Sequence, residues 1–163
     1  MKKFLVGLLT VALAASMLVG CGKKEEKKKA DNSLKDVQSK KELVLGLDSS
    51  FPPMGFTDKK DNIVGFDIDL AKEVTKRMGI KLKLQPINWN SKEQELNTEK
   101  VDCLWNGVTY SKARAKEKYV IGFRKDDKAL CNEVVKQLKA MAKDGTLKKI
   151  SEKWFDEDIT TIK

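Results

Sequence analysis

The chain has 163 residues, a formal net charge of +9, 40% hydrophobic content, no histidine and three cysteines. This length excludes large multi-domain enzymes and is enough for one ordinary domain or two small ones with a buried core. Residues 1–30 carry seven lysines and two glutamates, so the rest of the chain has a net charge of only +4. That surplus is too small to indicate a nucleic-acid-binding surface. The absence of histidine argues against most zinc sites and histidine-dependent catalysis, and we expect neither a metal nor a cofactor.

The N-terminal residues are typical of a secretory signal peptide. Lys2 and Lys3 precede an apolar or small run over residues 4–19, which is shorter than the roughly 20 residues of a membrane-spanning helix. The run ends in Leu-Val-Gly-Cys21, a tetrad that resembles a bacterial lipobox. We therefore predict a signal peptide over residues 1–20 and lipidation of Cys21, which would anchor the protein to the outer face of the bacterial cell membrane.

Residues 21–40 are expected to form a lipidated, flexible tether. The segment from residue 22 to residue 30 reads GKKEEKKKA, and it offers no large apolar side chain to a core. The folded domain is predicted over residues 41–163.

The spacing of apolar residues in the predicted domain alternates between the strand and the helix period. Buried strands are predicted at 43–47, 101–105 and 119–123, a half-exposed edge strand at 81–86 and a hairpin at 56–65. A turn is expected at 106–109. Helices are predicted to start at the capping residues Asp67, Ser91 and Thr146 and at Asp127, with a helical turn from Ser111. Strands separated by helices indicate an α/β fold, a three-layer sandwich with a mostly parallel sheet.

The residues that follow the strands suit an amino-acid ligand. Ligands of open parallel sheets bind at the carboxyl ends of the strands. The candidates there are Asp48 and Phe51 after the first strand, Trp89 after the second, and Gly107, Thr109 and Arg114 after the third. Each residue alone also has an ordinary structural interpretation, because aromatic residues beside strands commonly belong to the core.

Each candidate offers a contact that a zwitterion needs. Arg114 can bind a carboxylate, the Thr109 hydroxyl can donate to it, and the Gly107 carbonyl can accept from an ammonium group. Phe51 and Trp89 can enclose an apolar stem or contact a cation, and Asp48 can receive a polar or basic side chain.

Four sequence blocks carry a family resemblance: VLGLDSSFPPMGF, IVGFDIDLAKEV, ELNTEKVDCLWNGVTYSKAR and GFRKDDKALCNEVVKQLKAMAKDGTLKKISEKWF. In this order they resemble the extracellular solute-binding lipoproteins of amino-acid ABC importers. The resemblance implies a periplasmic-binding-protein-like (type II) fold of two lobes. It also implies a ligand cleft lined by the six candidates, and an ABC transporter permease as partner.

The chain departs from this family at one place. A whole second lobe is expected between about residues 117 and 120, where Lys118 instead leads directly into the predicted return strand. We therefore expect a single lobe that binds its amino acid weakly. A binding-defective or regulatory lipoprotein remains an alternative, as does a dehydratase-like enzyme, although Asp48 is the only carboxylate that we can assign to the cleft. Cys103 and Cys131 are expected to be buried free thiols, and a disulfide between them is the alternative.

Overall fold

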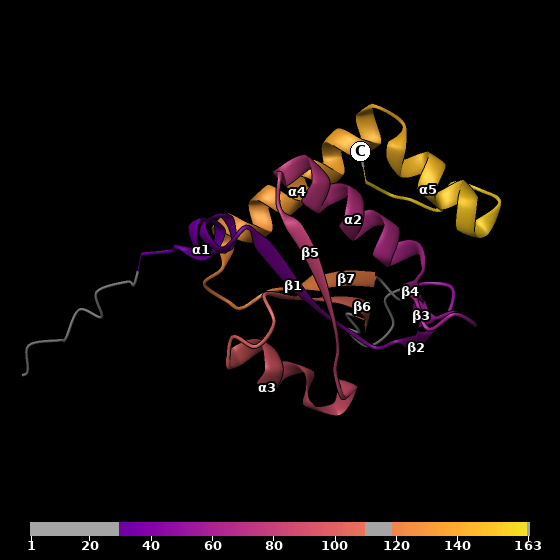
Figure 1. The fold of residues 1–163 in the computed structure, drawn as a ribbon. Coiled ribbons are helices and arrows are strands. Elements are labelled where there is room, and N and C mark those ends of the chain that lie inside the picture. The colour runs from indigo at the N-terminus through magenta and orange to yellow at the C-terminus, as the bar shows by residue number, and fades with distance from the viewer. Residues whose placement is uncertain (1–29, 110–118, 163) are drawn as a thin grey trace, which may run out of the picture. The chain divides into compact units, whose positions relative to one another are not determined.

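The computed structural model describes residues 30–109 and 119–162 (Figure 1). Residues Asp31–Lys163 form one compact unit. Its helices are α1 (Ser33–Lys40), α2 (Phe66–Met78), η1 (a 3-10 turn, Trp89–Ser91), α3 (Lys92–Asn97), α4 (Lys128–Lys143) and α5 (Thr146–Phe155). Its strands are β1 (Glu42–Leu47), β2 (Ser50–Phe51), β3 (Gly55–Thr57), β4 (Ile63–Val64), β5 (Lys81–Pro86), β6 (Cys103–Thr109) and β7 (Tyr119–Gly122).

The main sheet has the strand order β5-β1-β6-β7. Strand β1 runs parallel to both β5 and β6, whereas β7 runs antiparallel to β6. The prediction of a mostly parallel sheet, with residues 81–86 as a half-exposed edge strand, is confirmed. Strands β2, β3 and β4 form a separate antiparallel sheet, in which β3 and β4 are the predicted hairpin.

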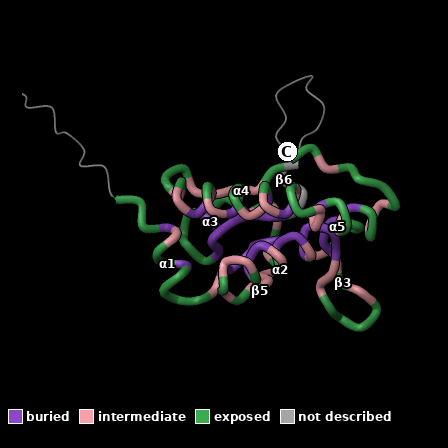
Figure 2. The backbone as a smooth tube through the Cα atoms, turned by 90° about the horizontal axis from the view of Figure 1, so that it is seen from above, coloured by how far each residue is buried: buried purple, intermediate pink, exposed green. Residues whose placement is uncertain are grey.

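Side chains of β1 alternate between two hydrophobic clusters. Leu43, Leu45 and Leu47 are fully buried in the larger cluster, which includes residues of α1, α2, α4 and α5. Val44 belongs instead to a smaller cluster on the other face, together with Leu96 of α3. Helices therefore cover both faces of the sheet, as the predicted three-layer sandwich requires (Figure 1). The buried residues run through the middle of the unit in Figure 2.

The C-terminal helices pack on the same core as the first half of the chain. The predicted face of α4, formed by Leu130, Val134, Leu138 and Met141, is buried. Leu147 of α5 is buried with it. The segments before and after Tyr119 therefore belong to one compact unit with a shared core.

Helix α2 begins earlier than predicted. Its N-cap is Gly65 rather than Asp67. The backbone at Gly65 has a φ of 141°, and a side chain there would collide with the Met54 carbonyl group, so this position requires glycine. Asp67 lies inside the first turn and is buried. The helix ends at Gly79 in the left-handed conformation, as predicted.

The predicted caps Ser91 and Thr146 do not act through their side chains either, whereas α4 begins at Asp127 as predicted. Ser91 precedes α3, but its hydroxyl donates to the Asn88 carbonyl at 2.9 Å. Asp127 is the N-cap residue of α4 without a side-chain cap bond. Gly145, not Thr146, is the N-cap residue of α5, and the Thr146 amide donates to Asp144 at 3.0 Å.

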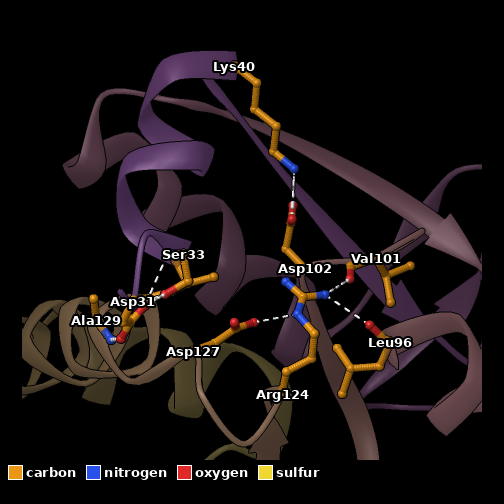
Figure 3. A network of polar contacts seen from close by, with 10 residues as sticks. Asp31, Ser33, Lys40, Leu96, Val101, Asp102, Arg124, Asp127 and Ala129 are labelled. Atoms are coloured by element: carbon orange, nitrogen blue, oxygen red, sulfur yellow. Dashed lines mark hydrogen bonds and ion pairs between the residues drawn. The ribbon is translucent and has the colours of Figure 1, made fainter. Parts of the chain in front are cut away.

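Residues 33–40 are not part of a tether, since they form helix α1. Val37 is 2% exposed, and the first residues of the helix contact α4. The Asp31 carboxylate accepts a hydrogen bond from the Ala129 amide at 2.6 Å (Figure 3). The Ser33 hydroxyl accepts one from the Leu130 amide at 3.2 Å. These oxygens satisfy donors at the N-terminus of α4 that Asp127 leaves open.

The prediction of a turn at 106–109 is wrong, because these residues belong to β6. Antiparallel pairing with β7 joins Val108 to Val120 and Thr109 to Tyr119, and it keeps this segment extended. The prediction that β7 is buried is also wrong. The strand lies at the edge of the sheet, and Val120 is 38% exposed. Cys103 is a buried free thiol, whereas Cys131 is free and only half-buried.

No helix within the described residues is long and apolar enough to span a bilayer.

Candidate functional site

The candidate residues follow strands that end at one edge of the main sheet. The last residue of β1, Leu47, pairs with Pro86, the last residue of β5. Asp48 and Trp89 therefore come directly after neighbouring parallel strands. The pairing of β1 with β6 ends at Gly46 and Leu104. Gly107 and Thr109 thus lie beyond the end of β1, at the same edge of the sheet as Asp48.

Asp48 begins the connection from β1 to the small sheet. One of its carboxylate oxygens accepts hydrogen bonds from the Ser50 amide at 2.9 Å and from the Ser50 hydroxyl at 2.6 Å. Such a local bond pattern fixes the turn of the chain. It leads the chain into β2, where the Phe51 side chain is 38% exposed.

Trp89 lies between the smaller hydrophobic cluster and the surface. Its half-buried ring packs against that cluster as the first residue of η1. The ammonium group of Lys92 lies 5.5 Å from the centre of the ring and donates to the Trp89 carbonyl at 3.3 Å. The ring therefore already contacts a cation of the protein itself, a contact that the sequence did not predict.

The remaining candidates are described only in part. The backbone of Gly107 and Thr109 belongs to β6. Arg114 and Cys21 lie outside the described residues, as does the predicted helical turn from Ser111. The structure thus brings Asp48, Trp89, Gly107 and Thr109 to one edge of the sheet.

A buried acid next to this edge was missed as a functional candidate. Asp67 is 6% exposed, and burial raises the pKa of its carboxyl group to about 7, although a hydrogen bond from the Trp105 side chain acts in the opposite direction. Trp105 lies in β6, two residues before Gly107. The sequence signal was the position of Asp67 between two large apolar residues, Phe66 and Ile68.

Polar contacts fix the start of β6 (Figure 3). The Asp102 carboxylate accepts from the Lys40 ammonium group at 2.7 Å and from the Val44 amide at 2.6 Å. The Arg124 guanidinium donates to the carbonyl groups of Leu96 and Val101 at 2.9 and 2.8 Å. These contacts join β1, β6, α3 and the segment after β7. They hold the strands whose ends carry the candidate residues.

The Arg124 guanidinium also forms an ion pair with Asp127 at 2.7 Å. Burial nevertheless raises the pKa of the Asp127 carboxyl group, because the lost hydration outweighs this favourable charge. Among the described residues, no cluster of three potential metal ligands is present.

Comparisons with known proteins identify a family. The bacterial extracellular solute-binding proteins, family 3, match residues 43–121 and 116–157 of the chain. The L-cystine-binding protein TcyJ of Escherichia coli (strain K12) is 31% identical over 117 residues, which are 71% of this chain and 41% of TcyJ. The chain thus spans about two fifths of the length of this relative.

Solved structures have the same fold. An ABC uptake transporter substrate-binding protein from Streptococcus pneumoniae with bound histidine superposes with a TM-score of 0.75 at 22% identity, covering 81% of this chain and 99% of that one. The arginine-bound form of domain 1 from TmArgBP is 32% identical, with a TM-score of 0.61. That match covers 64% of this chain and 97% of the domain. The predicted periplasmic-binding-protein-like fold is confirmed.

Proposed function

We propose that this chain, which belongs to family 3 of the bacterial extracellular solute-binding proteins, binds an amino acid for uptake by an ABC importer. The observation that carries the proposal is the meeting of strand ends at one edge of the sheet, where Asp48, Trp89 and Gly107 follow or extend three neighbouring strands. The names of the relatives support the ligand class, because they are a cystine-binding protein and an arginine-bound domain.

The proposed contacts divide the ligand into three parts. Arg114 binds the carboxylate with help from Thr109, and the Gly107 carbonyl accepts from the ammonium group. Phe51 and Trp89 flank the side chain, whose polar end meets Asp48. The family and its reported relatives are described as binding proteins, which favours this role over dehydration.

We further propose that the chain provides one lobe of the family's binding fold. The family matches the chain in two segments, residues 43–121 and 116–157, which overlap at residues 116–121. This is the place where the second lobe is expected to be missing. The relative TmArgBP supports the idea that one lobe can hold a ligand, because its domain 1 has been solved in an arginine-bound form.

A lone lobe leaves its ligand partly hydrated. Charge-assisted hydrogen bonds contribute about 1.5–3 kcal/mol each, whereas association costs several kcal/mol of lost translational and rotational freedom. We therefore propose dissociation constants in the high-micromolar to millimolar range, where 1 mM corresponds to about −4 kcal/mol.

The proposed location is extracytoplasmic, with an acyl anchor on Cys21 and an ABC transporter permease as partner. Support comes from the lipobox-like tetrad that ends at Cys21 and from the extracellular family. Mass spectrometry of the protein from a lipoprotein-exporting bacterium should show a diacylglyceryl group on an N-terminal Cys21. An unmodified Cys21, or cleavage elsewhere, would contradict the anchor without affecting the ligand site.

Calorimetric titration with the twenty amino acids, L-arginine among them, and with L-cystine tests the ligand site. We expect weak binding of at least one of them, abolished in Arg114→Ala and retained in Lys125→Ala, which removes an exposed cation from another region. Sub-micromolar binding by the monomer would contradict the single-lobe proposal. Equal binding by Arg114→Ala would contradict the assigned carboxylate contact. If no amino acid binds, the binding-defective alternative is favoured.

A further inference from the structure

Helix α4 has a basic outer face opposite its buried one. The residues of this face recur every three or four positions, as on one side of a helix, and they line an open hollow of about 420 Å³. They form two neighbouring rows, one of Asn132, Lys136 and Ala140 and the other of Val135, Lys139 and Lys143. We call this set the α4 basic face. The face carries three lysines and one exposed apolar side chain, Val135, with 42% of its surface accessible.

Two of these lysines have uncompensated charge. Lys136 pairs with Glu133 at 3.2 Å. Lys139 and Lys143 have no carboxylate within ion-pair distance among the described residues. A helix face that combines lysines with an exposed apolar side chain fits a surface that is anionic outside and apolar beneath, as a lipid headgroup layer is.

The chain enters the folded unit beside this helix. Asp31 is bound to the first turn of α4 through the Ala129 amide (Figure 3). Figure 1 shows α1 beside α4. Only ten peptide units separate residue 31 from Cys21, and such a length can extend to at most roughly 35 Å. The segment between them contains five lysines and two glutamates.

We propose that the α4 basic face docks on anionic phospholipid headgroups. The proposal rests on the proposed anchoring for one point only, namely that a lipidated Cys21 would keep α4 within reach of the membrane. The face itself is part of the folded unit and does not depend on the acyl chain. Attraction of juxtamembrane lysines to anionic lipid falls off within a Debye length, so docking is expected to be sensitive to salt.

Vesicle binding of protein that starts at residue 22, and therefore has no lipidation site, tests docking without the acyl anchor, and matched variants separate the face from the tether. The probe is a mixture of phosphatidylcholine and phosphatidylglycerol, compared with phosphatidylcholine alone, in a sedimentation assay. The variant Lys139→Gln/Lys143→Gln removes two charges from the face. The control Lys59→Gln/Lys60→Gln removes two exposed charges from the β3–β4 hairpin. It has the same net charge and the same tether as the face variant.

We expect binding to the anionic vesicles only, and its loss at high salt. The face variant should bind roughly 30-fold more weakly, as follows from the usual contribution of a basic residue near an anionic membrane, and the hairpin control should stay within about 2-fold of the parent. Equal weakening of both variants would overturn the proposal, because the tether or the net charge would then explain binding. Absence of binding to anionic vesicles would also overturn it and would leave the face to an acidic protein partner. Amino-acid titration without vesicles reports separately on the proposed function.

Discussion

The indole N–H of Trp105 donates a hydrogen bond to the buried carboxyl group of Asp67 and thereby joins β6 to the first turn of α2. The carboxyl group has a pKa of about 7 in the folded protein, compared with 3.8 for an ordinary aspartate. The folded state therefore binds more protons than the unfolded state between these two values, and stability contributed by this group is lost as the pH rises through them.

The first prediction concerns this pH dependence. Between pH 5 and pH 8 the free energy of unfolding should fall by roughly 2 to 3 kcal/mol through Asp67. Asp67→Asn cannot ionise and should lack this part of the fall. Urea unfolding of both proteins at the two pH values measures the difference. Titration of Glu73, whose pKa is lowered by Arg77, cannot mimic the effect, since Glu73 is ionised at both values. Parallel pH profiles of the two proteins would contradict the raised pKa.

The second prediction concerns the salt bridge at the start of β6. Asp102→Ala should destabilise the protein by about 3 kcal/mol, because it leaves the Val44 amide without its acceptor as well as removing the ion pair. Lys40→Ala should cost no more than about 1 kcal/mol, since the Lys40 side chain is 41% exposed. Chemical denaturation of the two variants gives the order. If Lys40→Ala proved as harmful as Asp102→Ala, the ion pair rather than the amide contact would dominate.

The third prediction concerns the cap that Asp31 provides to α4. Asp31→Ala removes the acceptor of the Ala129 amide, so this amide should exchange its hydrogen faster. Asp36→Ala, which changes an exposed acid of α1, is the matched control. Hydrogen exchange read at the first turn of α4 should separate the two variants. Limited proteolysis should also cut before residue 31 and spare residues 33–40 in the unmodified protein. Rapid cleavage within 33–40 would favour the tether that the sequence predicts.

The fourth prediction follows from the Lys92 ammonium group over the Trp89 ring. If Trp89 flanks the ligand side chain as proposed, a cationic ligand must approach this lysine. Lys92→Gln should therefore improve the affinity for L-arginine by about 2- to 5-fold, with little change for a neutral amino acid that binds. Paired calorimetric titrations supply the ratio. An equal change for both ligands would indicate that the lysine acts on the fold rather than on the charge of the ligand.

Periodicity predicted the elements whose apolar residues repeat over several turns or alternate along a strand. The buried face of α4 is one case, and the half-exposed strand β5 is another. Helix α1 was missed because its eight residues, SLKDVQSK, include only one residue that is both apolar and fully buried, Val37. Its stability comes from contacts with α4, which local sequence does not encode.

The strand β6 shows the same limitation at the candidate site. Asn106 and Gly107 favour a turn by propensity, but pairing with β7 extends the strand through them. The chain order of Asp48, Trp89 and Gly107 was sufficient to predict that they share one edge of the sheet. The contact between Lys92 and Trp89 could not be predicted in the same way, because the 3-10 turn at residues 89–91 determines it.

The hydrogen bond from Ala129 to Asp31 also has a consequence for the order of folding. It joins residues 98 positions apart, and contacts of such separation form late because a long loop must close first. During synthesis, Asp31 is made long before the helix that it caps. Helix α1 should therefore remain frayed until α4 has been translated. The N-terminal residues of the folded unit are then among the last to reach their native contacts, although they are the first to be made.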